Sequence, residues 1–327
     1  MNTVADMGGI TGLDTDARGR AAAWFFNVAL LIAVFLGALL LLASVSLILG
    51  GRISSFQVML AAAVMASVAF VIAGPGSARQ ARMLTGVVAV CALVAVSVVV
   101  AGSLYDLSFD GQAIHQEAIL QLAAGWNPYH DRLAPDTPHA IWIEHYAKGV
   151  WLQAAAVYSL TGRIETGKAI NLMLIAQSWL FVGALLMAYR RIPVWLVLVL
   201  AALAAFNPVS VYQASTYYVD GQLASLFLSM LALIGFAMRG ADTRVLIAIA
   251  AVIFMMVNVK FTGLVYAVML CGALAVMALY LWGWRSALKN LLMPAAGGLI
   301  GVLVVGFNPY VTNTLTQGHP FYPLLGE

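Results

Sequence analysis

Apolar runs recur along almost the whole chain, and only short polar stretches separate them. Most runs reach the roughly 20 residues with which a helix crosses the hydrocarbon core of a bilayer. This pattern predicts an all-α, polytopic transmembrane helical protein with about nine spans. The predicted spans are residues 21–49, 54–73, 84–104, 169–189, 193–208, 221–238, 245–260, 263–283 and 290–307.

One further stretch, 142–160, fits either a tenth span or a helix lying on the membrane surface. If it stays on the surface, ten of the sixteen Lys and Arg residues lie on one side, which the positive-inside rule makes cytoplasmic together with the N-terminus. Glu144, His145 and Lys148 also interrupt the stretch, so a surface helix is predicted. The ten basic residues are Arg18, Arg20, Arg79, Arg82, Arg190, Arg191, Arg239, Arg244, Arg285 and Lys289.

That topology places residues 105–168 outside the membrane, as a loop that carries seven of the thirteen acidic residues. Connections of this length usually carry function. Two surface helices are predicted within the loop, at 111–124 and at about 141–160. The outer face also holds all five histidines: His115, His130, His139, His145 and His319.

The first of these surface helices has an amphipathic pattern. Ile114 and Leu122 lie on an apolar stripe, and His115 falls on the opposite, polar side. Gly125 and Pro128 are expected to end the helix, because proline disfavours helical dihedrals in the residue before it.

Composition narrows the class of protein. Hydrophobic residues make up 63% of the chain and charged residues 9%, and the mean hydropathy is +0.96, which excludes a water-soluble fold. The net charge of +3 comes from scattered basic residues, so no nucleic-acid partner is predicted. Cys91 and Cys271 lie in apolar runs, so no disulfide framework is expected. Residues 1–20 are predicted to form a cytoplasmic segment rather than a cleavable signal.

Asp110 is the leading candidate for chemistry, because a rigid helix end just before it would hold its carboxylate at the outer membrane surface. This placement suits a general base that meets a lipid-borne reactant. It also suits an N-cap of the 111–124 helix. Asp106 and Glu117 are the alternative bases. Glu117 and His115 either position an acceptor or form the wet face of the helix.

Asp220 and Lys260 interrupt apolar runs, where a charge at the helix centre costs roughly 2.5–3.5 kcal/mol. Both lie near the outer ends of predicted spans. Lys260 either snorkels toward water or binds a phosphate group in a tight turn with Asn258 and Thr262. Asp220 opens a span and equally fits a helix cap.

A divalent metal is disfavoured, and no other cofactor is predicted. The outer loop offers a pool of possible ligands, but their spacing matches no zinc pattern. These residues are His130, His139, Glu144 and His145.

The layout resembles the GT-C class of membrane glycosyltransferases, which use polyprenyl-phosphate-linked sugars. The resemblance rests on a carboxylate just after a span, an outer loop with two surface helices, and further spans, over roughly residues 84–310. Residues 84–307 resemble the seven-span module of that class, and 21–83 would be two additional spans. Residues 308–327 form an extracytoplasmic tail that either folds back over the outer surface or leads into a longer chain.

The resemblance implies inverting transfer of a sugar from a polyprenyl-phosphate donor to a glycan or lipid acceptor on the extracytoplasmic face. Asp110 matches the base of that class by position, and Lys260 matches a basic residue that holds the donor phosphate. The other candidates for donor phosphate are Arg163, Lys168 and His319, and those for stacking on acceptor sugars are Trp126, Tyr129 and Trp142.

The resemblance is one of layout more than of motif. Only Pro138 stands where paired prolines often precede the second surface helix, and the Trp-Trp-Asp signature of oligosaccharyltransferases is absent, which disfavours protein N-glycosylation. Two other classes stay open: a transporter or flippase of a lipid-linked or polar solute, and a non-catalytic subunit of a membrane complex. A transporter typically carries polar groups near mid-membrane, whereas here they gather at one face. The Ala-, Val- and Gly-rich spans favour a bacterial plasma membrane, with membrane lipids as partners.

Overall fold

The computed structural model describes residues 16–76, 78–240 and 242–326. Within these ranges the chain forms thirteen α-helices with a few 3₁₀ and π turns, and it has no strand. The predicted all-α class is therefore confirmed. Most of the predicted N-terminal segment, residues 1–20, lies outside the described ranges.

Six helical segments in the described part of the chain are long and apolar enough to cross a membrane. This indicates an integral membrane protein. Two shorter apolar helices, α8 (Val194–Ala205) and α11 (Thr243–Met256), coincide with two more predicted spans, so the count of nine stays a prediction. The six are α1 (Ala17–Ile48), α2 (Ser55–Ile72), α3 (Arg79–Gly102), Ile164–Ala188 with α7 (Ala169–Ala188), α10 (Asp220–Ala237) and Phe261–Val305 with α12 (Phe261–Ile300).

Helix α12 is a hairpin of two arms rather than one rod. Gly283 within it has φ 71° and ψ 164°, a backbone conformation that glycine adopts readily. Gly263 in the first arm contacts Met256, and Gly301 after the second arm contacts Val257. Both ends of the hairpin therefore lie beside the end of α11, and the two arms match the last two predicted spans.

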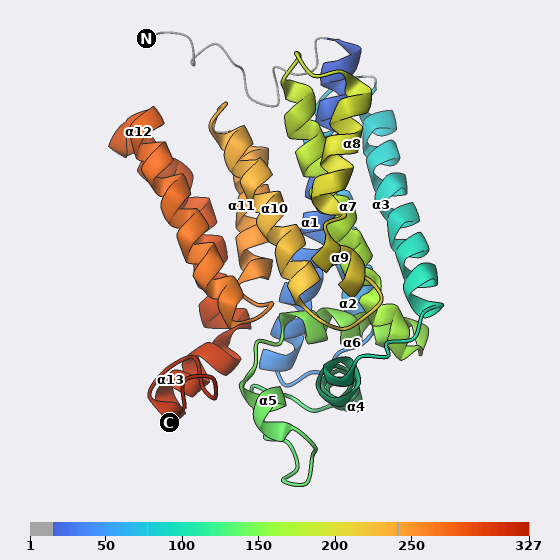
Figure 1. Ribbon diagram of the computed structural model, residues 1–327, viewed down its shortest axis with the longest axis vertical. Coiled ribbons are helices and arrows are strands. Elements are labelled where there is room, and N and C mark those ends of the chain that lie inside the picture. Colours follow the sequence, from blue (N-terminus) through green and yellow to red (C-terminus); the bar gives the residue numbers. More distant parts are fainter. Residues whose placement is uncertain (1–15, 77, 241, 327) are drawn as a thin grey trace.

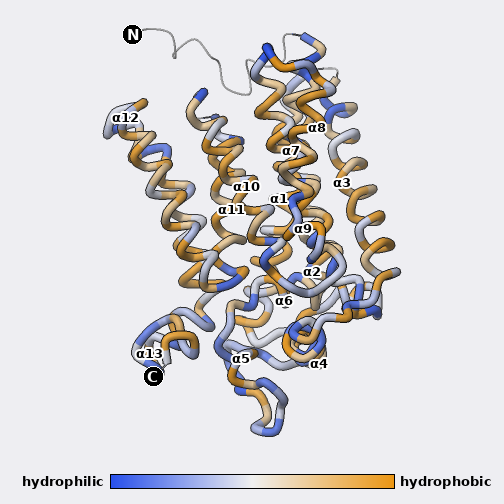
Figure 2. The backbone as a smooth tube through the Cα atoms, viewed as in Figure 1, coloured by the Kyte–Doolittle hydropathy of each residue, from blue (hydrophilic) through white to orange (hydrophobic). Residues whose placement is uncertain are grey.

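The helices have two distinct ends. Figure 1 shows α4, α5, α6 and α13 at one end, which we call the loop end, and the start of α1 at the other. We call the opposite end the arginine end. It holds the ion pair of Arg190 with Asp16. The Arg18 guanidinium there donates to the carbonyls of Met187 and Tyr189. Apolar residues dominate between the two ends (Figure 2).

Helix α1 lies in the core of the bundle. More than half of its residues are buried, and it packs on α7, α2 and α11. Phe26 meets the rings of Phe181 and Phe236 edge-on, with centroids 5.4 and 5.1 Å away. The first of the two additional spans is therefore integral to the same packed unit as the rest of the bundle.

The first predicted loop helix is confirmed. It consists of a π turn, η2 (Gly111–Gln116), followed by α4 (Glu117–Ala124). Gly125 ends it with φ 110°, the left-handed conformation that a glycine supplies at a helix C-terminus.

The second predicted loop helix, 141–160, is wrong as one surface helix. The chain forms α5 (Ala140–His145), breaks at residues 146–148, and continues as α6 (Gly149–Thr161). Helix α6 packs under α1, α2 and α4 with Gly149 to Val157 buried, because it is apolar on every side and a helix of that kind is buried. Gly149 begins α6 where any Cβ would collide with the Asn258 carbonyl.

The tail folds back over the loop end, which is one of the two arrangements expected from the sequence. It contains η5 (Phe307–Val311) and α13 (Thr312–Gln317). The Nδ1 atom of His145 lies 2.7 Å from Oδ1 of Asn313, and the Asn308 amide donates to the Pro128 carbonyl at 2.7 Å.

Candidate functional site

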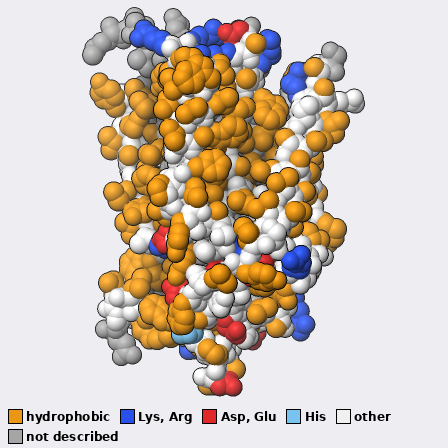
Figure 3. All heavy atoms as spheres, turned by 45° about the vertical axis from the view of Figure 1, so that its right-hand side comes forward, with side chains coloured by type: hydrophobic (Ala, Val, Ile, Leu, Met, Phe, Trp, Pro, Cys, Tyr) orange, Lys and Arg blue, Asp and Glu red, His pale blue; other side chains and the backbone are white. Residues whose placement is uncertain are grey.

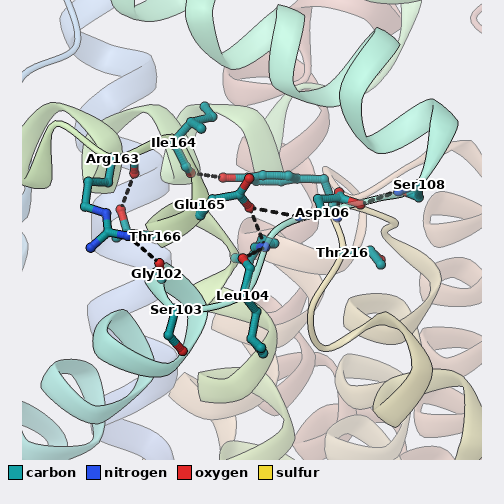
Figure 4. Close-up of polar contacts among 12 residues, drawn as sticks. Gly102, Ser103, Leu104, Asp106, Ser108, Arg163, Ile164, Glu165, Thr166 and Thr216 are labelled. Atoms are coloured by element: carbon teal, nitrogen blue, oxygen red, sulfur yellow. Dashed lines mark hydrogen bonds and ion pairs between the residues drawn. The ribbon is translucent and has the colours of Figure 1, made fainter.

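Asp106 is a buried anchor of the loop. It is 1% exposed. Its Oδ1 accepts from the Ser108 amide and hydroxyl at 2.8 and 2.6 Å, and its Oδ2 accepts from the Tyr217 amide at 2.6 Å (Figure 4). Oδ1 holds the loop after α3 in its own turn, and Oδ2 ties that loop to the turn before α10. Both oxygens are therefore occupied, and Asp106 has a structural role.

A second set of contacts fastens the two ends of the loop. Lys168 pairs with Glu165 and donates to the Leu104 carbonyl at 2.6 Å. Arg163 donates to the Gly102 carbonyl at 2.8 Å (Figure 4). The side chain of Lys168 has no exposed surface. These contacts give Lys168 and Arg163, two of the donor-phosphate candidates, a structural task.

Asp110 differs from Asp106 in having no partner. It is half-buried just before η2, and its side chain makes no capping hydrogen bond, so the N-cap interpretation is wrong. Among the described residues, no hydrogen bond or ion pair to its carboxylate is formed. Burial and the charges of Asp220 and Asp110 raise the pKa of the Tyr146 phenol above its ordinary range.

His115 points inward, not to the polar side as predicted. It is 7% exposed, because the π turn of η2 inserts an extra residue per turn and shifts the helical register. The Trp151 Nε1 donates to its Nδ1 at 2.7 Å. Burial lowers the pKa of His115 to about 4, although the charges of Asp106 and Asp220 oppose this. The ring is therefore neutral with its proton on Nε2, and that nitrogen makes no hydrogen bond to any described residue.

Asp220 and Lys260, 40 residues apart, form an ion pair. Their side chains are 46% and 21% exposed. Asp220 makes no cap hydrogen bond at the start of α10, so its predicted cap role is wrong. Gln213 donates to its other oxygen at 3.4 Å. The ammonium group of Lys260 is therefore accessible to solvent, and the carboxylate of Asp220 balances part of its charge.

The turn beside Lys260 does not form the predicted nest with Asn258. Asn258 is 1% exposed, and its amide donates to the carbonyls of Phe254 and Gly301, both at 2.9 Å. Its side chain thus joins α11 to the end of the α12 hairpin. Thr262 is exposed next to Lys260.

The three aromatic candidates have different surroundings. Trp126 is 8% exposed, and its Nε1 donates to the Asp131 carbonyl at 3.3 Å. Burial raises the pKa of Tyr129 to about 12, and its hydroxyl is bonded to Val305. Trp142 is half-buried in α5, and no hydrogen bond of its indole to a described residue is formed.

The remaining candidates have contacts of their own. Glu117 accepts from Gln121 within α4 at 2.7 Å, and His319 lies 2.9 Å from the Gly326 carbonyl in the tail. His130 lies 3.0 Å from the Ile48 carbonyl. No three His, Cys, Asp or Glu side chains of the described ranges gather as a metal site.

Sequence reasoning missed two residues of this end, Lys148 and Tyr146. Lys148 is 3% exposed, and its ammonium donates to Glu144 O, Tyr146 O and Asn308 Oδ1 at 2.7, 3.0 and 2.6 Å. Burial lowers its pKa to about 7. The signal in the sequence was a lysine placed directly before the largely apolar run from Gly149 to Val157. Tyr146 stacks on Trp151 and meets Phe261 edge-on, so it joins the loop to α12.

Together these residues form what we call the loop-end cluster: Asp110, His115, Tyr146, Asp220 and Lys260. It combines a carboxylate without a partner, a neutral imidazole with a free N–H, a phenol and an accessible ammonium. Such a set can accept a proton, donate a hydrogen bond and attract an anion. No protein-family model matches the chain, and neither a curated protein nor a solved structure gives a match to it.

Proposed function

We propose that the loop-end cluster transfers a sugar from a polyprenyl-phosphate donor to a hydroxyl of a glycan or lipid acceptor, on the extracytoplasmic face. The observation that carries this proposal is the contrast between the two aspartates of the loop. Asp106 is buried with both oxygens bonded, whereas Asp110 is half-exposed without a hydrogen bond. A general base needs a carboxylate that is free to accept a proton.

In the proposed reaction, Asp110 accepts the proton of the acceptor hydroxyl while that oxygen attacks the anomeric carbon of the donor. The bond between the anomeric carbon and the phosphate oxygen breaks, and polyprenyl phosphate leaves with the electron pair. One displacement of this kind inverts the anomeric centre. Lys260 approaches the leaving phosphate with the ammonium hydrogens that Asp220 does not use, and His115 offers its Nε2–H to a hydroxyl.

Two features of the molecule support this arrangement. The candidate base and the candidate phosphate-binding residue come from different parts of the chain, 150 positions apart, yet Tyr146 packs between their surroundings. Its ring stacks on Trp151, the hydrogen-bond partner of His115, and meets Phe261, the residue after Lys260, edge-on. Both also lie at helix ends, Asp110 before η2 and Lys260 before α12. The phosphate of a lipid-borne donor lies at the membrane surface, where spanning helices end.

The proposal is tested with the full-length protein in liposomes that contain synthetic polyprenyl-phosphate sugars, with release of polyprenyl phosphate as the readout. Asp110→Asn is expected to lower turnover at least about 100-fold, because a positioned base contributes at least this much. Asp136→Asn, an exposed carboxylate of the same loop, is the matched control and keeps wild-type turnover. Equal turnover in the Asp110 variant contradicts the proposal, and donor movement across the bilayer without hydrolysis or transfer favours a flippase instead.

A further inference from the structure

A cavity of about 1000 Å³ lies at the arginine end, far from the loop-end cluster. Its walls come from the first turns of α1, the end of α2 and the residues after it, the start of α3 and the start of α11. Figure 3 shows Lys and Arg side chains gathered mainly at this end of the molecule. The proposed sugar transfer makes no use of this cavity.

The charges that line the cavity are three arginines and one aspartate, a net charge of +2. Arg244 pairs with Asp242 at 3.3 Å. Arg82 donates through Nε and Nη2 to the carbonyls of Ala73 and Pro75, which fixes its position and leaves Nη1 free. The guanidinium of Arg20 forms no hydrogen bond or ion pair with any residue that the structure describes, and its backbone amide donates to the Asp16 carbonyl. The cavity therefore attracts an anion.

The rest of the lining is suited to an amphiphile. Trp24, Leu31 and Ile247 supply an apolar wall below the arginines. Asn27 also lines the cavity, and its Oδ1 is buried without a hydrogen-bond partner. A buried acceptor of this kind costs about 1–3 kcal/mol unless a donor reaches it. A ligand with a hydroxyl near its phosphate would supply that donor.

We infer that this cavity binds the phosphate-bearing headgroup of an anionic glycerophospholipid from the leaflet at the arginine end. Arg20 and Arg82 contact the phosphate, Asn27 accepts from a headgroup hydroxyl, and an acyl chain follows the apolar wall. Basic pockets between membrane helices on the cytoplasmic side recognise anionic lipid headgroups in this way. The positive-inside rule makes the arginine end cytoplasmic, so the bound lipid belongs to the inner leaflet.

The test uses the full-length protein in neutral detergent and native mass spectrometry to count bound lipids. Phosphatidylglycerol is expected to bind more tightly than phosphatidylcholine with the same acyl chains. Arg20→Gln is expected to weaken phosphatidylglycerol binding roughly fivefold, the effect of one basic residue near an anionic headgroup. Arg20→Lys keeps most of the binding, and Arg285→Gln, an exposed arginine near the α12 turn and outside the cavity, keeps all of it.

Three outcomes overturn the inference. Equal binding of the two lipids by the wild-type protein removes the anionic preference, and this comparison needs no variant that folds. An equal loss in Arg285→Gln and Arg20→Gln points to general surface charge and not to the cavity. Displacement of the lipid by an equal concentration of soluble glycerol phosphate shows that a free phosphate, and not a lipid, is the ligand.

Discussion

The indole of Trp151 donates a 2.7 Å hydrogen bond to Nδ1 of His115, across 36 positions of the chain. Because an indole N–H only donates, the contact requires a neutral imidazole. Both side chains are buried. Protonation of His115 would break the bond and place a charge among apolar groups of η2 and α6.

Acidification is therefore expected to destabilise the fold. The pKa of His115 is about 4 in the folded protein, against an ordinary value of 6.5. Between these pH values the unfolded chain binds more protons, so stability is complete above pH 6.5 and falls as the pH drops toward 4. The loss amounts to about 3 kcal/mol. It is measured as the thermal unfolding midpoint at pH 4 to 7. His115→Gln is expected to flatten the slope of this midpoint against pH. An unchanged slope in this variant, or a flattened slope in His319→Gln, argues against His115 as the cause.

The two aspartates of the loop are expected to respond oppositely to the same change. Asp106→Asn lowers the free energy of unfolding by about 2 kcal/mol, because an amide has one acceptor oxygen where the carboxylate serves three donors on two oxygens. Asp110→Asn leaves the unfolding midpoint within error, since no hydrogen bond is lost. Thermal unfolding of the two variants side by side decides this. A large loss in Asp110→Asn would mean that its carboxylate is structural.

Gly111 is expected to tolerate no side chain. A Cβ there would collide with the Asp106 carboxylate and the Ser108 hydroxyl, and both are held by hydrogen bonds. Gly111→Ala should therefore cost about 1–3 kcal/mol of stability. Gly272→Ala in α12 is the matched control, because nothing lies within 4 Å of the added carbon, and it should be neutral or slightly stabilising. Equal behaviour of the two variants would contradict the collision.

Lys148 is expected to hold the tail against the loop. Its replacement by Met leaves Asn308 Oδ1 and the Tyr146 carbonyl without their donor, which costs about 2 kcal/mol. The tail should then be cleaved faster in limited proteolysis. Lys289→Met, an exposed lysine at the arginine end, is the control. Wild-type cleavage rates in Lys148→Met would show that other contacts suffice.

Lys260 is expected to act on the donor rather than on stability. Lys260→Met should raise the KM for the polyprenyl-phosphate sugar about tenfold, because it removes a charge-assisted contact that contributes about 1.5 kcal/mol. Stability should change little, because a half-exposed pair contributes little. Lys260→Arg keeps the charge and most of the affinity. A KM that stays at the wild-type value in Lys260→Met would remove Lys260 from the site.

Much of the helical layout was predictable from local signals. Apolar runs located the long helices, and Gly125 ended the first loop helix as its sequence context indicated. The burial of α6 was missed because Glu144, His145 and Lys148 were assigned to the same helix, whereas they lie in α5 and in the break before α6. The inward orientation of His115 could not be predicted either. The prediction assumed the periodicity of an α-helix, and a π turn has a different periodicity.

The residue types of the candidate site could be predicted from the sequence, but the ion pairs and hydrogen bonds between those residues could not. Asp110, Lys260 and Asp220 were each identified as charges in unusual places. The ion pair of Asp220 with Lys260 spans 40 positions, and the Lys148 contact with Asn308 spans 160. Pairings at such separations depend on how whole helices pack, which one sequence does not specify. The different surroundings of Asp106 and Asp110 likewise arise from Tyr217, 111 positions beyond Asp106.

The Nζ of Lys168 and the carbonyl of Leu104 lie 2.6 Å apart although 64 positions separate them. This contact holds the loop after α3 beside the start of α7. The segment between them is nevertheless part of the packed bundle, because α6 lies against α1 and α2. A foreign insert joined at these two positions would therefore remove packing partners of both helices, so protein engineering of this segment is better done by single substitutions than by exchange.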